Sequence, residues 1–300
     1  MRVILATDGS ASARISADLV AACRWPEGST IDVVGVLDVM ALLPAPFSPT
    51  PVDLQPLEDG LALYVDQSLV EARDRIRSAG LSVTVTRLTG HPVDAIARYA
   101  TEVGADLIVC GSRGHGALRS LLLGSVSAGL ADRAHCPVLV ARHPTAQRVL
   151  LADDGSEPAL AAERVVETWP MFEESAVDVL SVAYVHPVWR SAVGMLALGP
   201  GFAWDDDAVP DGRQRAEQVN RDAVARLAAA GRTAAGVVLD GDPADVIVSE
   251  AAARGADLIV VGTHGRGAID RLVLGSVARA VLLHAHTSVL VVRPPAPPTA

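Results

Sequence analysis

Gly111-Ser112-Arg113-Gly114-His115-Gly116 and, a short run later, Leu123-Gly124-Ser125-Val126 form the stretch from which the fold of this chain can be predicted. The stretch directly follows the apolar run Ala105–Cys110 and reads G-x2-G-x9-G-S. Backbone N–H groups approach an anion closely where no Cβ atom intervenes, and the N-terminus of a helix supplies unpaired donors and positive potential. A buried strand that ends in glycines and restarts as a helix is therefore suited to phosphate. The alternative is a tight turn that only needs positive φ.

A second copy of this stretch lies further along the chain. It reads Gly262-Thr263-His264-Gly265-Arg266-Gly267, then Leu274-Gly275-Ser276-Val277, and it follows the apolar run Ala256–Val261. Two complete copies, each placed after an apolar run, favour a phosphate site over a simple turn. Each copy is also preceded, much earlier in the chain, by the same acidic turn: Asp8-Gly9-Ser10 and Asp154-Gly155-Ser156.

The repeat predicts the domain organisation. Gly90 also returns as Gly241, so the whole chain reads as two copies of one unit. A period of about 150 residues is the size of a domain rather than of a solenoid repeat. We therefore expect a tandem duplication, with a first domain over residues 1–143, a second over 147–293 and a proline-rich disordered tail over 294–300.

Strands and helices are expected to alternate along both copies. The first copy is expected to contain Arg2–Ala6, Ala11–Cys23, Ile31–Val39, Leu61–Ser78, Leu81–Leu88, Pro92–Val103, Ala105–Cys110, Ser125–Ala134 and Val138–Arg142. The second is expected to contain Arg148–Ala152, Ser156–Thr168, Ala176–Val185, Arg213–Ala230, Thr233–Leu239, Pro243–Arg254, Ala256–Val261, Ser276–Ala285 and Ser288–Arg293. Irregular segments at 40–60 and 186–212 interrupt both copies.

This alternation predicts the α/β class: two tandem, five-stranded, parallel, doubly wound sandwiches with strand order 3-2-1-4-5. Such sheets bind ligands beyond the carboxyl ends of their strands, where the strand order reverses. The first and fourth strands are central neighbours in this order. Asp8 is therefore expected opposite the Gly111 loop, and Asp154 opposite the Gly262 loop.

Composition limits the function. The 300 residues carry a net charge of -10, which argues against a nucleic-acid partner, and aromatic residues make up only 3%. No apolar run approaches the ~18–20 residues that cross a bilayer, and no signal peptide is evident, so a soluble cytoplasmic protein is expected. The cysteines Cys23, Cys110 and Cys136 fit no zinc spacing and are expected to be small buried apolar residues.

All 25 basic residues are arginines, because the chain contains no lysine. This excludes a P-loop lysine, a Schiff-base lysine and a Ser-Lys dyad. Phosphate charge must then be met by backbone N–H groups, by arginine and by a metal ion.

The acidic turn after the first strand, paired with the G-x2-G-x9-G-S stretch, resembles the universal stress protein family in its tandem two-domain form. The resemblance covers both copies but not the irregular segments or the tail. It implies the adenine-nucleotide α-hydrolase-like fold, with one ATP in each domain and a divalent ion, for which we expect Mg²⁺; the metal ligands stay unassigned.

The resemblance also implies residue roles. Asp8 and Asp154 would hold the adenine or ribose end, Val36 and Val182 would line the adenine slot, and Gly90 and Gly241 would form the far wall. The remaining nucleotide contacts would come from Ala6, Gly111, Arg113, Gly114, Gly116, Gly124, Ser125 and Val126 in the first copy, and from Ala152, Gly262, Gly265, Arg266, Gly267, Gly275, Ser276 and Val277 in the second. No catalytic residue is assigned, and both copies are expected to bind.

Simpler readings remain for several of these residues. Asp8, Asp154, Ser125 and Ser276 are also plausible helix caps. His115 and His264 occupy different places in their loops, so neither resembles a dedicated catalytic base. The pair His284 and His286 has a spacing that points the rings apart on a helix, and the acidic run Asp205–Asp207 reads as a solvated loop.

Three functions are compatible with these residues. The first is an ATP-binding stress or signalling switch, in which occupancy changes conformation and partner binding. The second is a slow Mg²⁺-dependent ATPase, and the third is an interaction module with vestigial sites. The switch is favoured, because no H-x-G-H or S-G-G-x-D-S signature of enzymatic relatives of this fold is present.

The last strands of the two copies, Val138–Val140 and Val289–Val292, are apolar edges. We expect them to pair with each other in a pseudo-twofold unit, and we expect that unit to form a homodimer.

Overall fold

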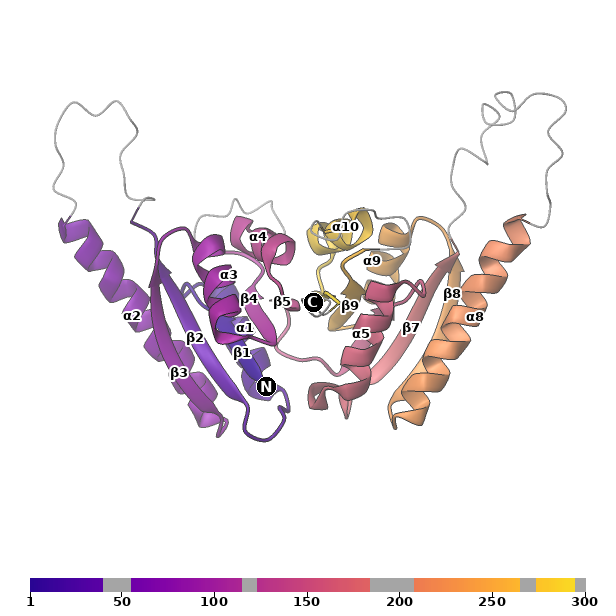
Figure 1. Ribbon diagram of the computed structural model, residues 1–300, viewed down its shortest axis with the longest axis horizontal. Coiled ribbons are helices and arrows are strands. Elements are labelled where there is room, and N and C mark those ends of the chain that lie inside the picture. Colours follow the sequence, from indigo (N-terminus) through magenta and orange to yellow (C-terminus); the bar gives the residue numbers. More distant parts are fainter. Residues whose placement is uncertain (40–54, 115–122, 184–207, 265–273, 295–300) are drawn as a thin grey trace, which may run out of the picture.

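The computed structural model describes residues 1–39, 55–114, 123–183, 208–264 and 274–294. Two similar halves lie side by side, related by an approximate twofold axis (Figure 1). The first half contains β1 (Arg2–Ala6), α1 (Ala11–Ala22), β2 (Thr30–Leu37), α2 (Gln55–Ser78), β3 (Ser82–Thr89), α3 (Pro92–Val103), β4 (Leu107–Gly111), α4 (Ser125–Arg133) and β5 (Val138–Ala141).

The second half repeats this order with one added 3-10 turn. It contains β6 (Arg148–Ala152), α5 (Glu157–Thr168), η2 (Pro170–Phe172), β7 (Ala176–Ala183), α8 (Ala208–Ala229), β8 (Thr233–Asp240), α9 (Pro243–Ala253), β9 (Leu258–Gly262), α10 (Ser276–His284) and β10 (Ser288–Val292). The predicted alternation of strands and helices is therefore confirmed in both halves.

Local sequence explains where the helices begin and end. Ser10 and Ser156 are the N-caps of α1 and α5, and each side chain accepts a hydrogen bond from the backbone N–H three residues on. Proline opens both α3 and α9, where its missing N–H costs nothing. Gly104 ends α3 in the left-handed conformation, with φ of 65°.

The strands form one ten-stranded sheet with the order β3-β2-β1-β4-β5-β10-β9-β6-β7-β8. The first half has the predicted order 3-2-1-4-5, and the second half has the same order reversed. All paired strands within a half are parallel, whereas β5 and β10 pair in antiparallel fashion, with Leu139 opposite Leu290. The predicted pairing of the last strands is confirmed, and it fuses the two sheets into one.

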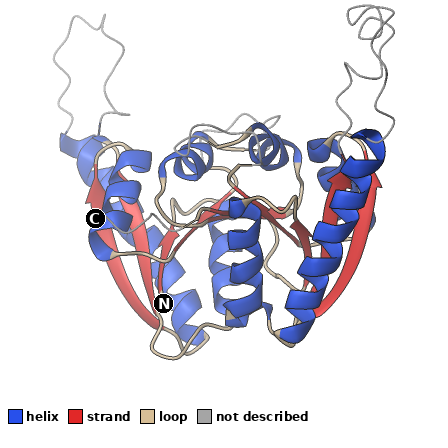
Figure 2. Ribbon diagram, turned by 45° about the vertical axis from the view of Figure 1, so that its right-hand side comes forward, coloured by secondary structure: helices blue, strands red, loops and turns tan. Residues whose placement is uncertain are grey.

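Helices cover both faces of the sheet (Figure 2). One apolar core lies between the sheet and α1, α2, α5 and α8, and the other lies between the sheet and α3, α4, α9 and α10. Both cores cross the join between the halves, because Leu139 and Leu290 belong to the first and Val140 and Val289 to the second. The two halves thus share their apolar interior.

Two arginines cross the join in opposite directions. Arg142, just after β5, donates from Nη2 to the carbonyl oxygen of Leu282 in α10 at 2.7 Å. Arg293, just after β10, donates to the carbonyl oxygens of Ala131 and Asp132 in the last turn of α4, both at 3.1 Å. Cationic side chains stabilise the carbonyl end of a helix. Each half therefore supplies the cation for the other half's glycine-loop helix.

Some predicted boundaries were wrong. α2 begins at Gln55 rather than Leu61, and α8 begins at Ala208 rather than Arg213. Ser125 and Ser276 are not N-caps, because Gly124 and Gly275 take that position. The segments 40–54 and 184–207, the acidic run Asp205–Asp207 and residues 295–300 of the predicted tail lie outside the described residues.

Candidate functional site

The turn after β1 and the loop after β4 lie against each other, as the strand order predicts. A Cβ atom built at Gly111 would lie 2.7 Å from the carbonyl carbon of Ser12, so β4 ends in direct contact with the start of α1. The hydroxyls of Ser12 and Ser112 are 3.2 Å apart. In the second half, a Cβ atom at Gly262 would lie 2.6 Å from the backbone of Pro158. Only glycine allows this approach in either half.

One serine in each half ties the acidic turn to the glycine loop. The Ser10 hydroxyl accepts from the N–H of Ala13 and donates to the carbonyl oxygen of Arg113, both at 3.2 Å. Ser156 makes the equivalent bonds with Ala159 and with the carbonyl oxygen of His264, both at 3.3 Å. A single side chain therefore caps the first helix and fixes the start of the loop.

Asp8 and Asp154 both stabilise their own turns. Oδ1 of Asp8 accepts from the N–H of Ser10 and Oδ1 of Asp154 from that of Ser156, each at 3.0 Å. A Cβ atom built at Gly114 would lie 2.5 Å from Oδ2 of Asp8, so this carboxylate stands next to the glycine loop. The aspartates are not the helix caps that the simpler reading expected, because Ser10 and Ser156 take that position. Each aspartate instead holds its own turn, and Asp8 also faces the loop.

The glycine loops end in helix N-termini with the same geometry. The N–H of Gly124 donates to the carbonyl oxygen of Ser112, and that of Gly275 to Thr263, both at 2.7 Å. No side chain caps α4 or α10 within the described parts of the loops. The first N–H groups of a helix have no partner within the helix. The N–H groups of Ser125 and Ser276, the first residues of α4 and α10, therefore lie where each glycine loop ends.

The second half contains a cavity of about 530 Å³ at this position. Ligand sites of small molecules commonly fall in this range of volume. Several residues predicted to contact the nucleotide line this cavity: Ala152, Asp154, Val182, Gly262, Gly275, Ser276 and Val277. The strand ends, the acidic turn and the start of α10 therefore enclose one space.

The walls of the cavity are mainly apolar. Leu180, Ile247 and Val261 supply apolar surface, and Pro243 at the start of α9 closes one side. Gly241, predicted on the far wall, precedes this helix with φ of 150°. A mainly apolar lining with a few polar groups suits a ligand that has a flat apolar part and an anionic part.

In the first half, the matching residues occupy the matching places. Ala6 ends β1, and Val36 lies on β2, partly buried against the core that contains β4. Gly90 follows β3 with φ of 118° and donates its N–H to the carbonyl oxygen of Leu37. Val126 is the second residue of α4. Of the other predicted residues, the exposed Arg113 is described, whereas His115, Gly116, Gly265, Arg266 and Gly267 lie outside the described residues.

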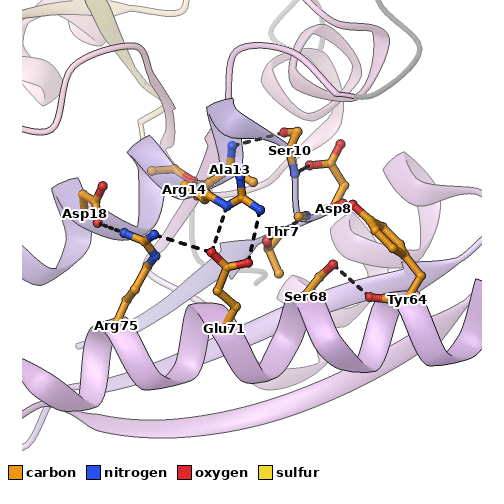
Figure 3. A network of polar contacts seen from close by, with 12 residues as sticks. Thr7, Asp8, Ser10, Ala13, Arg14, Asp18, Tyr64, Ser68, Glu71 and Arg75 are labelled. Carbon is orange, nitrogen blue, oxygen red and sulfur yellow. Dashed lines mark hydrogen bonds and ion pairs between the residues drawn. The ribbon is translucent and has the colours of Figure 1, made fainter.

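A polar network lies behind the first acidic turn (Figure 3). Tyr64 of α2 donates its hydroxyl to the carbonyl oxygen of Asp8 at 2.9 Å. Further along, Arg14 donates to Glu71 at 2.8 Å, and Arg75 donates to Asp18 at 2.7 Å. The hydrogen bond from Arg14 is the main cause that lowers the pKa of Glu71. These contacts join α1 to α2 and support the turn that carries Asp8.

The second half places a buried carboxylate behind its acidic turn. Asp153 is 2% exposed, lines the cavity, and accepts from the N–H of Gly155 at 2.7 Å through Oδ1. Burial raises the pKa of Asp153 to about 6; the Gly155 N–H opposes this rise, and the charges of Glu163 and Asp154 add to it. Sequence reasoning missed this residue. Comparing Thr7-Asp8-Gly9 with Asp153-Asp154-Gly155 was the signal that could have found it.

Two of the three cysteines are buried as predicted, whereas Cys23 is only partly buried. Cys110 and Cys136 are buried, and burial raises the pKa of each thiol to about 12. Within the described ranges, no helix is long and apolar enough to span a membrane. Nor does the described part of the chain gather three His, Cys, Asp or Glu side chains in a position to hold a metal ion.

Comparison with known proteins identifies the family. The model of the universal stress protein family matches residues 1–142 and again residues 145–293. A universal stress protein of Mycobacterium tuberculosis is 35% identical over 231 residues, which cover 71% of this chain and 70% of the relative.

Solved structures share the fold. A universal stress protein from Archaeoglobus fulgidus matches 97% of this chain and 98% of its own, with a TM-score of 0.67 and 21% identity. A universal stress protein solved in complex with cAMP matches 48% of this chain and 98% of its own, with a TM-score of 0.35 and 27% identity. With the family model matched once in each half, the chain belongs to the universal stress protein family and has its tandem two-domain form.

Proposed function

We propose that this protein binds one adenine nucleotide in each half, ATP above all, and that occupancy acts as a stress or signalling switch rather than as a step in fast catalysis. The observation that carries the proposal is the cavity of about 530 Å³ enclosed by the acidic turn, the glycine loop and the start of α10. The binding units in this proposal are the domains expected from the sequence, residues 1–143 and 147–293.

The adenosine part of the ligand fits the inner, apolar end of the cavity. Ala152, Val182 and Ile247 offer flat apolar surface for a purine ring. Asp154 also lines the cavity, and a carboxylate accepts hydrogen bonds from ribose hydroxyls or from the amino group of adenine. In the first half we assign the same tasks to Asp8 and Val36.

The phosphates fit the glycine-rich end. The N–H groups of Ser276 and Val277 lie in the first turn of α10, where the helix dipole favours an anion, and Gly275 at the N-cap leaves room for a phosphate because it has no Cβ atom. In the first half we assign the same tasks to Ser125 and Val126, and to Gly124. The chain has no lysine, so backbone donors and arginine carry the recognition.

Mg²⁺ fits this proposal as a companion of the nucleotide. Such an ion is commonly bound by one or two carboxylates together with the phosphates of the substrate. The described residues hold no cluster of three acidic, histidine or cysteine side chains, so the phosphates of the nucleotide would supply most of the ion's ligands there. Its chemistry there is to neutralise phosphate charge.

A switch is favoured over an enzyme because, among the residues that the structure describes, the two sites share no evident general base beyond Asp8 and Asp154. His264 lines the second cavity, whereas Arg113 holds the matching position of the first loop. His135 recurs as His286, but Nδ1 of His135 lies 3.1 Å from Thr101 of α3, near the far end of α4 from the glycine loop. Hydrolysis, if it occurred, would rest on metal and positioning alone.

Titration of the purified protein with ATP and Mg²⁺ tests the proposal. Calorimetry should give two ATP per chain, and phosphate release measured in the same samples should stay far below 1 s⁻¹, the low end of ordinary enzymes. Turnover above about 1 s⁻¹ would favour the ATPase, and no binding at micromolar ATP would favour an interaction module. Light scattering of the same samples tests the expected homodimer.

A further inference from the structure

Thr7 and Asp153 occupy the same position in the two halves. The hydroxyl oxygen of Thr7 accepts from the N–H of Gly9 at 3.3 Å, and Oδ1 of Asp153 accepts from the N–H of Gly155 at 2.7 Å. The geometry of the acidic turn is thus preserved, but a neutral hydroxyl in the first half is replaced by an ionisable group in the second.

The second oxygen of Asp153 is buried without compensation. Oδ2 has no hydrogen-bond partner in the described part of the protein. The nearby cation, Arg226 of α8, is committed to Glu163 of α5: its Nη2 donates to Oε2 at 2.8 Å, and its Nε donates to Oε1. Glu163 is itself 2% exposed. One cation therefore serves two buried carboxylates and forms hydrogen bonds with only one of them.

The charges that face Asp153 are mostly negative. Glu163 acts from α5 and Asp154 from the same turn, whereas Arg226 acts from α8 with Asp222 beside it. Asp153 also stands in the wall of the cavity that contains Gly262, Gly275 and Ser276. A phosphate bound at these residues would add negative charge in the space that Asp153 borders.

We propose that Asp153 makes the nucleotide affinity of the second site depend on pH, whereas the first site, with Thr7 at this position, lacks that dependence. The inference rests on the proposed function. Asp153 is a positioning residue, because its own charge lies behind the turn that carries Asp154 and acts on the ligand from there. The two halves of one chain then hold the same ligand under different conditions.

The direction of the effect follows from linkage. Burial and neighbouring carboxylates raise the pKa of Asp153 to about 6 in the free protein. A bound polyphosphate repels the carboxylate and raises this pKa further, so the complex takes up protons. The affinity of the second site for ATP should therefore increase as the pH falls from the pKa of Asp153 in the complex to its pKa of about 6 in the free protein. Below about pH 6 the affinity should level off.

Asp153→Asn isolates this charge. The amide keeps an oxygen for the N–H of Gly155 but cannot ionise, and Asp153→Thr copies the first half. ATP affinity would be measured by calorimetry from pH 5 to pH 8.5 in a Gly114→Val background that disables the first site, and also in the otherwise unaltered chain. Because a terminal phosphate titrates near pH 6 itself, the variants are compared with Asp153 at each pH.

At pH 8 the Asn and Thr variants should bind ATP about three- to tenfold more tightly than the protein with Asp153, and at pH 5 all three should bind alike. Buffers of different ionisation enthalpy should reveal extra proton uptake near pH 6.5 only where Asp153 is present. A constant affinity ratio at every pH would overturn this inference and leave the proposed function intact. Absence of ATP binding in the unaltered chain and in every variant would overturn both this inference and the proposed function.

Discussion

Arg142 donates a 2.7 Å hydrogen bond from Nη2 to the carbonyl oxygen of Leu282, and a 3.1 Å bond from Nη1 to that of Thr287, although it lies about 140 residues earlier in the chain. Burial lowers the pKa of Arg142 to about 10. The guanidinium therefore acts as a structural cation that links β5 to the end of α10.

Arg142→Ala should destabilise the protein by about 2–3 kcal/mol, because two buried carbonyl oxygens lose a charged donor. Chemical denaturation monitored by circular dichroism would measure the loss. The control is Arg98→Ala, whose exposed pair with Glu102 should contribute less than about 1 kcal/mol. Equal effects of the two substitutions would show that the contact across the join is not stabilising.

Ser10→Ala and Ser156→Ala should each lower stability by about 1–2 kcal/mol, because each removes a helix cap and a bond to the glycine loop. Each should also weaken ATP binding in its own half only. Thermal unfolding and calorimetric titration would separate the two effects. Ser249→Ala, at an exposed position on α9, removes a hydroxyl bonded to its own helix and should change neither quantity measurably.

Gly114→Val should abolish ATP binding in the first half and leave the second half intact, so the stoichiometry should fall from two to one. A Cβ atom at this position would come within 2.5 Å of Oδ2 of Asp8. The control is Gly60→Ala, because a Cβ atom there would meet nothing within 4 Å. Loss of both sites with the fold intact would mean that the sites are coupled or the assignment is wrong.

Asp153→Asn should stabilise the protein above pH 6 by about 1–3 kcal/mol. The pKa of Asp153 is raised from 3.8 to about 6 in the folded state, and each pKa unit corresponds to about 1.4 kcal/mol. Above pH 6 the carboxylate is ionised in both states, so the folded state bears the full cost. Between pH 6 and about 4 the folded state binds the proton more tightly and the gain from Asn shrinks; below about 4 it disappears.

Urea denaturation at pH 5, 6, 7 and 8 would measure this difference. Glu102→Gln makes the same chemical change at an exposed position and serves as the control, with a difference within about 0.5 kcal/mol at every pH. A stabilisation by Asn that does not vary with pH would point to packing rather than to ionisation.

The repeat and the apolar periodicity were enough to predict the fold, since buried parallel strands are the most apolar segments of the chain. β1 and α3 match the prediction at both ends: β1 is one apolar run, and α3 is bounded by Pro92 and Gly104. The start of α2 was missed because its first turn carries exposed residues such as Leu57 that do not follow the core periodicity.

The site was predictable only as far as motifs define it. The approach of Gly111 to α1 follows from the strand order, and so does the position of Asp8 beside Gly114. The burial of Asp153 could not be read from the sequence, since its surroundings include α8, which is far away along the chain, as well as the neighbouring α5. The contributions of Pro243 and Ile247 to the cavity depend on the same kind of long-range contact.

The antiparallel join of β5 and β10 has a consequence for behaviour in solution. Residues 143–147 link the first half of the chain to the second. Pairing of β5 with β10 is therefore intramolecular, and its strength does not depend on protein concentration. Two separate chains with the same interface would dissociate on dilution. Because both sites belong to one chain, a substitution can change one nucleotide site and leave the other unchanged. Thr7 and Asp153, which occupy the same position in the two halves, are an example. The protein thus has the architecture of a dimer without a dimer's obligatory symmetry.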